Sequence, residues 1–260
     1  MPQLKIGIAA SALRQPLRRA IASAQRLGAS AVELEARDEL RPSEVTDTAL
    51  RQIKKLLDDA NLKVCSLSFM TRRGYNDLDA LDRRVAATKE AMQLAYKLRA
   101  PVVVNSIGRV PQEAGEGDWD LFLETLGDLG HFADRAGASL AARTGSEEGA
   151  ALARLLAALP AGGVGVDFDP AALLVNGYSA IDALAHLGPY VRQVRARDGV
   201  RDLAAGRGQE TQLGRGSADF PALIGALEDF AYRGYFTIDR QHSADPQSDI
   251  ANAVQFLRNM

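Results

Sequence analysis

Eight short runs of apolar residues recur along the chain, and segments with helical spacing separate them. Most of these runs are continuous rather than alternating, which is typical of strands buried on both faces of a parallel sheet. The pattern therefore predicts eight buried strands: Lys5–Ala9, Ala31–Glu35, Leu62–Phe69, Pro101–Ile107, Ala138–Ala142, Gly163–Phe168, Tyr190–Ala196 and Tyr235–Asp239.

Apolar residues three and four positions apart predict helices between the strands. The clearest are Leu17–Leu27, Thr48–Ala60, Leu78–Leu98, Trp119–Ala136, Glu147–Leu159 and Phe220–Ala231. Eight strand–helix units in 260 residues average about 32 residues each, the size of a βαβ step, and a closed (β/α)8 barrel commonly has about 250 residues. An open doubly wound sheet would carry a glycine-rich phosphate loop after its first strand, but residues 9–14 contain no glycine. The sequence predicts a single α/β domain over residues 1–260, a (β/α)8 TIM barrel.

Composition and charge exclude several classes of protein. The 31 basic and 33 acidic side chains leave a formal net charge of -2, which argues against nucleic-acid binding through bulk charge. A single cysteine, Cys65, cannot form a disulfide framework and suits a reducing cytoplasm. The first residues lead directly into a strand rather than a signal sequence, and no apolar stretch approaches the ~20 residues of a membrane span. We expect a cytoplasmic protein with no membrane or nucleic-acid partner; the sequence leaves open whether it is a homo-oligomer.

The common catalytic motifs are missing. The chain contains no GxSxG elbow, no HExxH and no P-loop lysine, and its Gly-Arg-Gly segments near 206–216 lack dinucleotide spacing. His131 and His186 fall in or near predicted helices, where a polar side chain needs no catalytic role. His242 directly follows the eighth strand and is therefore a candidate at the mouth of the barrel.

Charged and polar residues end seven of the eight predicted strands. Since strand ends of a (β/α)8 barrel assemble its active site, and ionised groups there must be paired or face a polar cavity, we expect one such cavity. The candidate catalytic residues are Glu33, Arg143, Asp169, Arg195 and Asp239. The candidate substrate-binding residues are Arg72, Arg73, Asn105, Arg197, Asp198, Arg215 and His242.

Two structural expectations follow from these charges. Asp169 and Asp239 are expected to pair with Arg143 and Arg195 across the mouth, because unpaired charges there are costly. The segment Gly199–Gly216 combines glycine amides with Arg201, Arg207 and Arg215. Because loops after the last strands of such barrels often bind phosphate, this segment is expected to be mobile when empty and to close over an anion.

At these positions the chain resembles the xylose isomerase-like TIM-barrel family, which includes sugar phosphate isomerases and epimerases and, more remotely, endonuclease IV. The likeness covers essentially the whole chain. It is carried by Val32–Leu34, Leu67–Tyr75, Val164–Ala171, Gln193–Asp198, Leu213–Gly216 with Asp219-Phe220, and Gly234-Tyr235.

The resemblance implies a divalent metal held by a Glu, an Asp, a His and a Glu at the ends of strands five to eight. The matching positions are Arg143, Asp169, Arg195 and Asp239. Arginine has no lone pair to donate and stays charged, so two guanidinium groups would repel a divalent ion. We therefore expect no metal and no other cofactor, and an anion in the place where relatives hold their ion.

The function that the resemblance implies is a sugar or sugar-derivative isomerase or epimerase acting on a small, anionic, sugar-like molecule. A carboxylate of Glu33, Asp169 or Asp239 would move a proton next to a carbonyl, and arginine would hold the developing oxyanion. The alternative is a catalytically inactive barrel that binds an anionic carbohydrate or a protein partner. Phosphodiester cleavage would require metal ligands and a basic groove that the sequence does not indicate.

Overall fold

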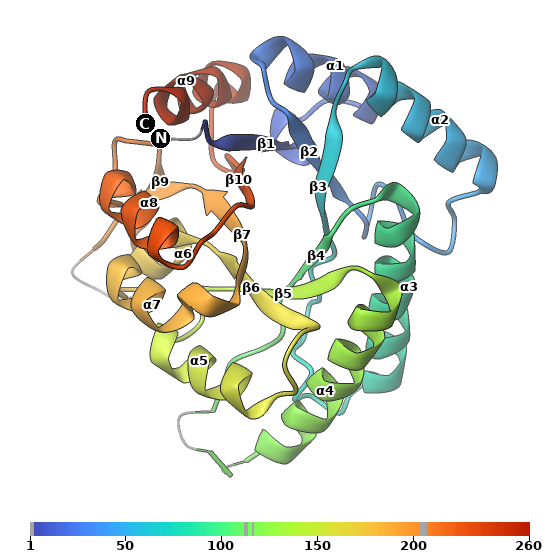
Figure 1. The fold of residues 1–260 in the computed structure, drawn as a ribbon, viewed down its shortest axis with the longest axis vertical. Helices are drawn as coiled ribbons and strands as arrows, with labels where there is room; N and C mark the ends of the chain where they lie inside the picture. Colours follow the sequence, from blue (N-terminus) through green and yellow to red (C-terminus); the bar gives the residue numbers. More distant parts are fainter. Residues whose placement is uncertain (1–2, 112–113, 116, 203–206) are drawn as a thin grey trace.

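The computed structural model describes residues 3–111, 114–115, 117–202 and 207–260, and its strands form a closed barrel (Figure 1). The order around the barrel is β1-β10-β7-β6-β5-β4-β3-β2, and each neighbouring pair is parallel. The bounds are β1 Lys5–Ala9, β2 Ala31–Glu35, β3 Lys63–Ser68, β4 Val102–Asn105, β5 Ser139–Arg143, β6 Val164–Phe168, β7 Val191–Ala196 and β10 Tyr235–Ile238. All eight predicted strands are confirmed, and closure of the sheet excludes the open alternative.

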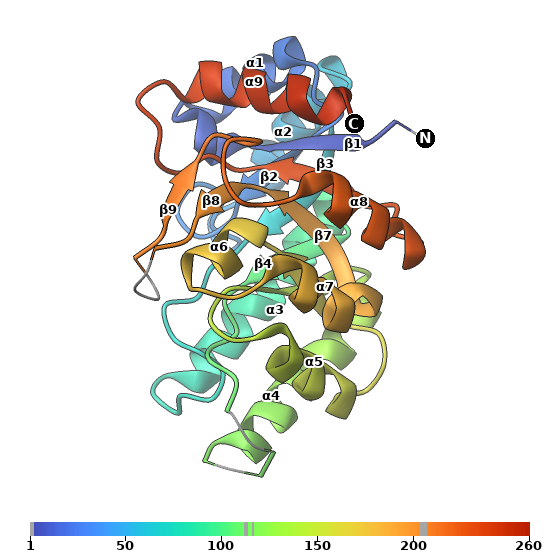
Figure 2. The ribbon, with the colours of Figure 1, turned by 90° about the vertical axis from the view of Figure 1, so that its left-hand side faces the viewer.

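The six predicted helices are also present and lie outside the strands (Figure 1). They are α1 Leu17–Leu27, α2 Asp47–Asp59, α3 Leu81–Leu98, α4 Trp119–Ala136, α5 Gly149–Ala158 and α8 Phe220–Asp229. The last helix, α9 (Pro246–Arg258), packs beside α1 and β1 and so closes the ring of helices (Figures 1 and 2). None of the described helices is both long enough and apolar enough to cross a membrane.

Three helices and two short 3-10 turns lie outside the residue ranges given above for the clearest helices. The helices are α6 (Pro170–Val175), α7 (Ala180–Leu187) and α9, and the turns are Ala10–Leu13 and Gly188–Tyr190. Each of the three helices begins with a capping side chain that accepts a hydrogen bond from a backbone N–H three residues further on. Asp169, Ser179 and Asp245 are these caps, so the signal was in the sequence even where a helix was too short to show a period.

The glycine-rich segment after β7 contains a short hairpin that the sequence did not predict. Within it, β8 (Asp198–Val200) and β9 (Gln209–Thr211) form an antiparallel pair, and β8 packs against α6 (Figure 2). The prediction that Gly199–Gly216 is mobile when empty and closes over an anion stays a prediction, and residues 203–206 of this segment lie outside the described residues.

The apolar core lies mainly between the barrel and its helices, whereas much of the barrel interior is polar. The main buried cluster joins residues of the strands, including Ile8, Leu34 and Leu140, to residues of the surrounding helices. A small separate cluster contains Val102, Val104 and Ala141. Elsewhere the inward positions carry buried ionised and amide side chains, so the barrel is stable only if these groups satisfy one another.

Close packing of α4 against the start of β6 gives a test of the fold. A Cβ atom at Gly163 would lie 1.9 Å from the carbonyl oxygen of Gly130, which is a backbone atom. We expect Gly163→Ala to lower the free energy of unfolding by roughly 1–3 kcal/mol or more, because helix and strand must separate. Urea denaturation followed by circular dichroism measures this.

Gly127→Ala is the matched control, since Gly127 lies on the same helix and a Cβ atom there would meet nothing within 4 Å. This change is expected to raise the free energy of unfolding by about 1 kcal/mol through helix propensity. Equal effects of the two substitutions would contradict the packing described.

Candidate functional site

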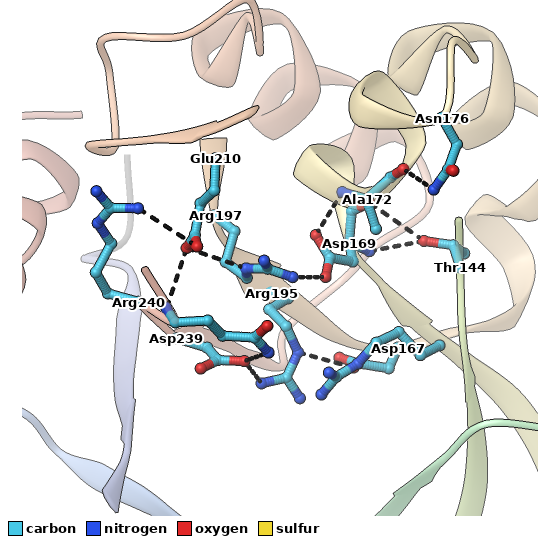
Figure 3. Close-up of polar contacts among 12 residues, drawn as sticks. Thr144, Asp167, Asp169, Ala172, Asn176, Arg195, Arg197, Glu210, Asp239 and Arg240 are labelled. Atoms are coloured by element: carbon cyan, nitrogen blue, oxygen red, sulfur yellow. Dashed lines mark hydrogen bonds and ion pairs between the residues drawn. The ribbon is translucent and has the colours of Figure 1, made fainter. Parts of the chain in front are cut away.

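One buried arginine lies at the centre of the polar interior. Arg195 on β7 donates from Nε to Asp167 (2.9 Å), from Nη1 and Nη2 to the two oxygens of Glu33 (2.9 and 2.8 Å), and from Nη1 to Asp239 (3.1 Å). Its side chain is 0% exposed, and those of Asp167, Glu33 and Asp239 are 0%, 4% and 9% exposed. Figure 3 shows the guanidinium between Asp167 and Asp239.

These contacts pass through the barrel. Glu33 lies on β2, and β1 and β10 separate β2 from β7 around the wall, so the Arg195–Glu33 pair can form only across the interior. Burying one arginine with three carboxylates is tolerable because every charge has a partner of opposite sign or a hydrogen-bond donor.

Uncharged side chains donate the remaining hydrogen bonds to the two deepest carboxylates, Glu33 and Asp167. Gln193, two residues before Arg195 on β7, donates from its amide nitrogen to Glu33 (3.0 Å) and to Asp167 (3.2 Å). The Ser66 hydroxyl donates to Glu33 at 2.7 Å. All four oxygens of Glu33 and Asp167 therefore accept hydrogen bonds, and neither carboxylate has an oxygen left for a ligand.

The pKa values reflect the competition between burial and pairing. Burial acts to raise the pKa of Glu33, but the charges of Arg195 and Arg143 and the bonds from Arg195 and Ser66 outweigh it and lower the pKa to about 2. Burial raises the pKa of Asp167 even though both arginines oppose it. Burial also disfavours the charged form of Arg195, yet Asp167, Glu33 and Asp239 hold its pKa well above the ordinary value. Arg195 and Glu33 are thus a permanent ion pair at neutral pH.

A second set of charges lies at the ends of β6 and β7. Asp169 accepts from the Ala172 N–H (3.0 Å) as the cap of α6, and from Arg197 Nη1 at 2.6 Å. Although burial acts to raise it, the pKa of Asp169 is lowered, mainly by the charge of Arg197. The Thr144 hydroxyl accepts from the Asp169 backbone N–H at 2.8 Å. The helix cap therefore sets the direction of this carboxylate (Figure 3).

Glu210 on β9 links the segment after β7 to the segment after β10. It accepts from Arg197 Nε (3.4 Å) and from the backbone N–H groups of Gln241 (3.2 Å) and His242 (3.0 Å). Arg240 forms an ion pair with it at 3.4 Å (Figure 3). Burial acts to raise the pKa of Glu210, but Arg197 and the hydrogen bonds from His242 and Gln241 lower it. The β8–β9 hairpin is held over the mouth by this carboxylate.

The expected pairing across the mouth is partly confirmed. Arg195 does pair with Asp239. The expectation that Asp169 pairs with Arg143 or Arg195 is wrong, because Asp169 caps α6 and pairs with Arg197. Arg143 instead donates from Nε to Asp167 at 3.1 Å, since the two residues face each other in the register of β5 and β6.

Other residues singled out in the sequence lie outside this network. Asn105 is buried and donates from its amide nitrogen to the Phe69 carbonyl oxygen at 2.7 Å. Arg72 and Arg73 line a separate groove beside α3. The exposed His242 imidazole contacts Glu210 at 3.1 Å, and Arg215 is exposed.

Asp198 holds the segment after β8 in place. Its carboxylate accepts backbone hydrogen bonds from Gly199 (2.8 Å), Gly214 (3.0 Å), Gly216 (2.8 Å) and Ala218 (3.0 Å). A Cβ atom at Gly216 would lie 2.1 Å from the Asp198 carboxylate, so the close approach requires glycine there. With its oxygens engaged by backbone amides, Asp198 fixes the loop above the mouth. Arg201 and Arg207, the other arginines expected at a phosphate site, are exposed, and Arg201 donates to the Gly177 carbonyl oxygen.

Two side chains of the Arg195 network retain atoms for a ligand. Asp239 accepts from Arg195 and from the Gln241 side chain (3.2 Å) on the same oxygen, Oδ2, so Oδ1 has no partner among the described residues. Arg143 is 15% exposed and is bonded within the described part of the chain through Nε alone, which leaves both Nη groups available. A carboxylate oxygen and a guanidinium fork are thus presented at the barrel mouth.

Three members of the site were missed from sequence. Gln193 shares the inward face of β7 with Arg195, and the two-residue spacing could have identified it. Asp167 and Asp169 are two positions apart, so both would point to the same face of an extended strand. The sequence pattern therefore did not show which of the two pairs with Arg195. Glu210 lies on β9, which the sequence did not predict, so it was not among the residues selected at the ends of predicted strands.

The donor set bears on whether a metal fits. Among the described residues, no group of three or more His, Cys, Asp or Glu side chains is arranged to hold a metal ion. Glu33, Asp167 and Asp239 do converge, but the atoms between them belong to a guanidinium group, which is a hydrogen-bond donor without a lone pair. The three carboxylates that could bind a metal cation are already paired with the guanidinium cation of Arg195.

The chain is similar to known barrels in both sequence and structure. The family model described as xylose isomerase-like TIM barrel matches residues 21–260. No curated protein sequence gives a significant match. Among solved structures, the xylose isomerase domain protein from Planctomyces limnophilus is 25% identical, with a TM-score of 0.87 over 99% of this chain and 97% of that one.

More distant structures share the fold. A xylose isomerase-like TIM barrel protein from Mycobacterium smegmatis, in complex with magnesium, is 15% identical with a TM-score of 0.80 and covers 99% of this chain and 96% of that one. D-allulose 3-epimerase from Methylomonas sp., in complex with D-allulose, is 17% identical with a TM-score of 0.77 over 99% of this chain and 97% of that one. At these identities the likeness concerns the fold alone.

Removing the central guanidinium should be costly. We expect Arg195→Met to lower the free energy of unfolding at neutral pH by about 3–5 kcal/mol, because three buried carboxylates lose their partner. Arg192→Met on the same strand is the control; Arg192 is only partly buried and donates a single bond, to the Gly162 carbonyl oxygen, so we expect at most about 1 kcal/mol.

The stability deficit of the same variant relative to the wild type should depend on pH. The pKa of Glu33 is lowered from 4.5 to about 2, so its contribution is present above about pH 4.5 and lost as the pH falls toward 2. Without Arg195 the buried carboxylates gain raised pKa values, and acid then stabilises the variant relative to neutral pH. Urea titrations between about pH 4 and 7 measure this; a deficit that does not shrink in acid would refute the charge balance.

A second buried carboxylate, Glu147 in the segment after β5, lies apart from the Arg195 network. It accepts from the Val110 backbone N–H at 3.4 Å. Burial raises its pKa from 4.5 to about 7, although that bond and Arg109 oppose the shift. Because the pKa of Glu147 is raised in the folded state, the free energy of unfolding falls as the pH rises from about 4.5 to about 7.

Glu147→Gln should remove this penalty. The variant is expected to gain up to about 3 kcal/mol of unfolding free energy relative to wild type between about pH 4.5 and 7, with a plateau above. Glu148→Gln, at the exposed neighbouring position, serves as the control and should follow wild type at every pH. Thermal unfolding across this range measures the difference, and parallel curves for wild type and Glu147→Gln would contradict the burial of an ionisable carboxyl group.

Proposed function

Because the chain belongs to the xylose isomerase-like TIM barrel family, we propose that it is a sugar or sugar-derivative isomerase or epimerase that works without a divalent metal. Sugar epimerases are among its structural neighbours. The proposed reaction moves a proton on a carbon next to a carbonyl, at the mouth of the barrel. The observation that carries the proposal is that the Arg195 network leaves Asp239 Oδ1 and the Arg143 Nη groups without a partner among the described residues; Asp239 is bonded to Arg195, and Arg143 is bonded to Asp167.

The proposed roles follow from which atoms remain available. Asp239 Oδ1 is the base that takes the proton from the carbon next to the carbonyl. The Arg143 Nη groups donate to the carbonyl oxygen as it gains negative charge, which stabilises the enolate. Arg195 orients Asp239 through the hydrogen bond from its Nη1 to Asp239 Oδ2, as a positioning residue. An isomer forms when the proton goes to the former carbonyl carbon and the hydroxyl proton of the first carbon moves to the former carbonyl oxygen. An epimer forms when water protonates the first carbon from the opposite face and Asp239 releases its proton to solvent.

A divalent metal does not fit these residues. Within the described chain, Glu33, Asp167 and Asp239 are the carboxylates that converge in the interior, and all three accept from Arg195. A metal there would have to displace a guanidinium and would lie close to a second positive charge on Arg143. Positive charge from arginine therefore takes the place of Lewis-acid polarisation in the proposed reaction.

The substrate class is proposed to be a small anionic sugar derivative. Arg143 and Arg197, with side chains 15% and 11% exposed, lie at the rim of the mouth. Guanidinium groups bind carboxylate and phosphate oxygens through two parallel hydrogen bonds. A sugar phosphate or sugar acid fits this rim better than a neutral sugar.

A catalytically inactive barrel that binds an anionic carbohydrate is the second candidate. It is favoured by the saturation of Glu33 and the helix-capping role of Asp169, because neither of these carboxylates is free to act as a base. The two candidates differ in one respect, which is whether a carbon-bound proton is exchanged.

Proton exchange with solvent tests the reaction directly. In D₂O, the protein is incubated with a panel of aldoses, ketoses, sugar phosphates and sugar acids, and loss of the signal of the hydrogen next to the carbonyl is followed by NMR. We expect exchange with at least one anionic member, unaffected by a chelator, and a fall in kcat of about 10²–10⁴-fold in Asp239→Asn. Arg143→Met should lower kcat by about 10²-fold or more.

Asp229→Asn, at an exposed position at the end of α8, is the matched control and should keep full activity. Binding of an anionic sugar without any exchange would establish the inactive barrel. Exchange that a chelator abolishes and Mn²⁺ or Mg²⁺ restores would overturn the metal-free mechanism.

A further inference from the structure

A groove rich in arginine lies beside the barrel mouth. It has a volume of about 620 Å³ and runs between the segments after β2 and β3 and the first turns of α3. Glu33, Asp167, Arg195 and Asp239 are not among its lining residues. Six guanidinium groups line it: Arg37, Arg41, Arg72, Arg73, Arg83 and Arg84. This groove is therefore separate from the Arg195 network.

Most of these arginines hold the walls of the groove. Arg73 pairs with Asp77 (3.1 Å) and Asp79 (2.7 Å), and Arg84 donates to the Asp79 carbonyl oxygen at 2.9 Å. Arg41 pairs with Glu44 at 3.1 Å. Their charges are partly neutralised and their positions are set by the protein itself.

Two of the arginines are not used in this way. Arg72 and Arg83 are exposed and form no hydrogen bond or ion pair with any other described residue. The carboxylates that line the groove with them are Asp38, Asp79 and Glu90, and Asp79 is already paired with Arg73. Arginines thus outnumber carboxylates in the lining, and the excess positive charge includes two guanidinium groups with all their donors free.

The lining also includes an unsatisfied donor and several apolar side chains. Nε of Arg84 is buried and has no hydrogen-bond partner among the described atoms, and such unsatisfied donors are uncommon and costly in folded proteins. The rest of the lining includes Phe69, Pro42 and three alanines, which provide an apolar surface beside the charges. Charged groups that adjoin an apolar surface can hold the two ends of a small organic anion.

We infer that this groove binds a phosphorylated small molecule of roughly nucleotide size, as a site distinct from the proposed active site. Its volume lies within the range of about 300–1,000 Å³ that small-molecule sites usually have. Arg72 and Arg83 bind the phosphate oxygens, because free guanidinium forks match phosphate geometry and carry full charge at every physiological pH. The sugar or base rests against Phe69 and its apolar neighbours.

The inference is tested by isothermal titration calorimetry with ADP and with inorganic pyrophosphate. The wild-type protein is expected to bind ADP more tightly than pyrophosphate, because ADP adds contacts with the apolar lining. The double variant Arg72→Ala/Arg83→Ala should raise the dissociation constant for both probes by at least about tenfold, since each lost charge-assisted hydrogen bond is worth about that factor. Arg72→Lys/Arg83→Lys keeps the charge but loses the fork, so we expect an intermediate value.

Two further variants distinguish binding in this groove from binding at the barrel mouth and from attraction by surface charge. Arg18→Ala/Arg19→Ala removes two exposed charges from α1, outside the groove, and should leave both dissociation constants unchanged. Arg143→Ala should also leave them unchanged while it impairs the proposed reaction. Thermal unfolding checks that the exposed groove variants keep the wild-type fold.

Several results would count against this site. No binding of either probe at millimolar concentration, or binding that Arg72→Ala/Arg83→Ala does not weaken, would overturn the inference. Loss of binding in Arg143→Ala alone would place the anion at the barrel mouth and would likewise overturn it. An equal effect of Arg18→Ala/Arg19→Ala would show attraction by net charge rather than a site.

Discussion

The interior of this barrel depends on the balance of charge around one guanidinium group. Glu33 and Asp167 lie on β2 and β6, and Asp239 directly follows β10. An ionised carboxylate in a dry interior is costly unless it is paired. Arg195 pairs with all three at 2.8–3.1 Å. Because such a network gives little net stability but is expensive to break at any one member, it acts as a constraint: the strands must keep the register that lets every donor meet its acceptor.

The same network decides which atoms are left for chemistry. Every oxygen of its deepest carboxylates, Glu33 and Asp167, accepts a hydrogen bond from the protein. These two residues therefore hold Arg195 in place and do not contact a ligand. The reactive groups lie one layer further out, where Asp239 keeps an oxygen and Arg143 keeps two nitrogens. In a (β/α)8 barrel this layer is the carboxyl end of the strands, where ligands bind. The Arg195 network thus both neutralises the buried carboxylates and determines which atoms of Asp239 and Arg143 stay available to a ligand.

Arginine has two different environments in this molecule. In the interior, Arg195 is enclosed by acidic partners that hold its pKa well above the ordinary value. Beside α3, Arg72 and Arg83 face a groove whose carboxylates are fewer and in part already paired. A guanidinium group always keeps its charge, so the first environment satisfies that charge within the protein and the second leaves it for a ligand.

The arrangement of the strands was readable from the sequence, and the pairing of the charges was not. Continuous apolar runs predicted all eight barrel strands, and polar residues at their ends placed Glu33, Arg143, Arg195 and Asp239 correctly on the inner wall or its rim. Periodicity succeeds here because burial acts on each strand locally. The short helix α6 and the β8–β9 hairpin escaped it because six-residue and three-residue elements carry too few positions to show a period.

Which charge meets which is a property of the closed barrel. Asp167 and Asp169 differ by two positions and point to the same face of an extended strand, yet the first joins Arg195 and the second turns to cap α6. The register between β5 and β6 places Arg143 opposite Asp167. The contact between Arg195 on β7 and Glu33 on β2 forms only because closure of the barrel brings these non-neighbouring strands face to face. The sequence by itself determined the elements and the charges they carry, since burial and capping act over a few residues. The tertiary structure decided the partners, because a hydrogen bond requires contact to within about 3 Å and only the closure and stagger of the barrel set such distances.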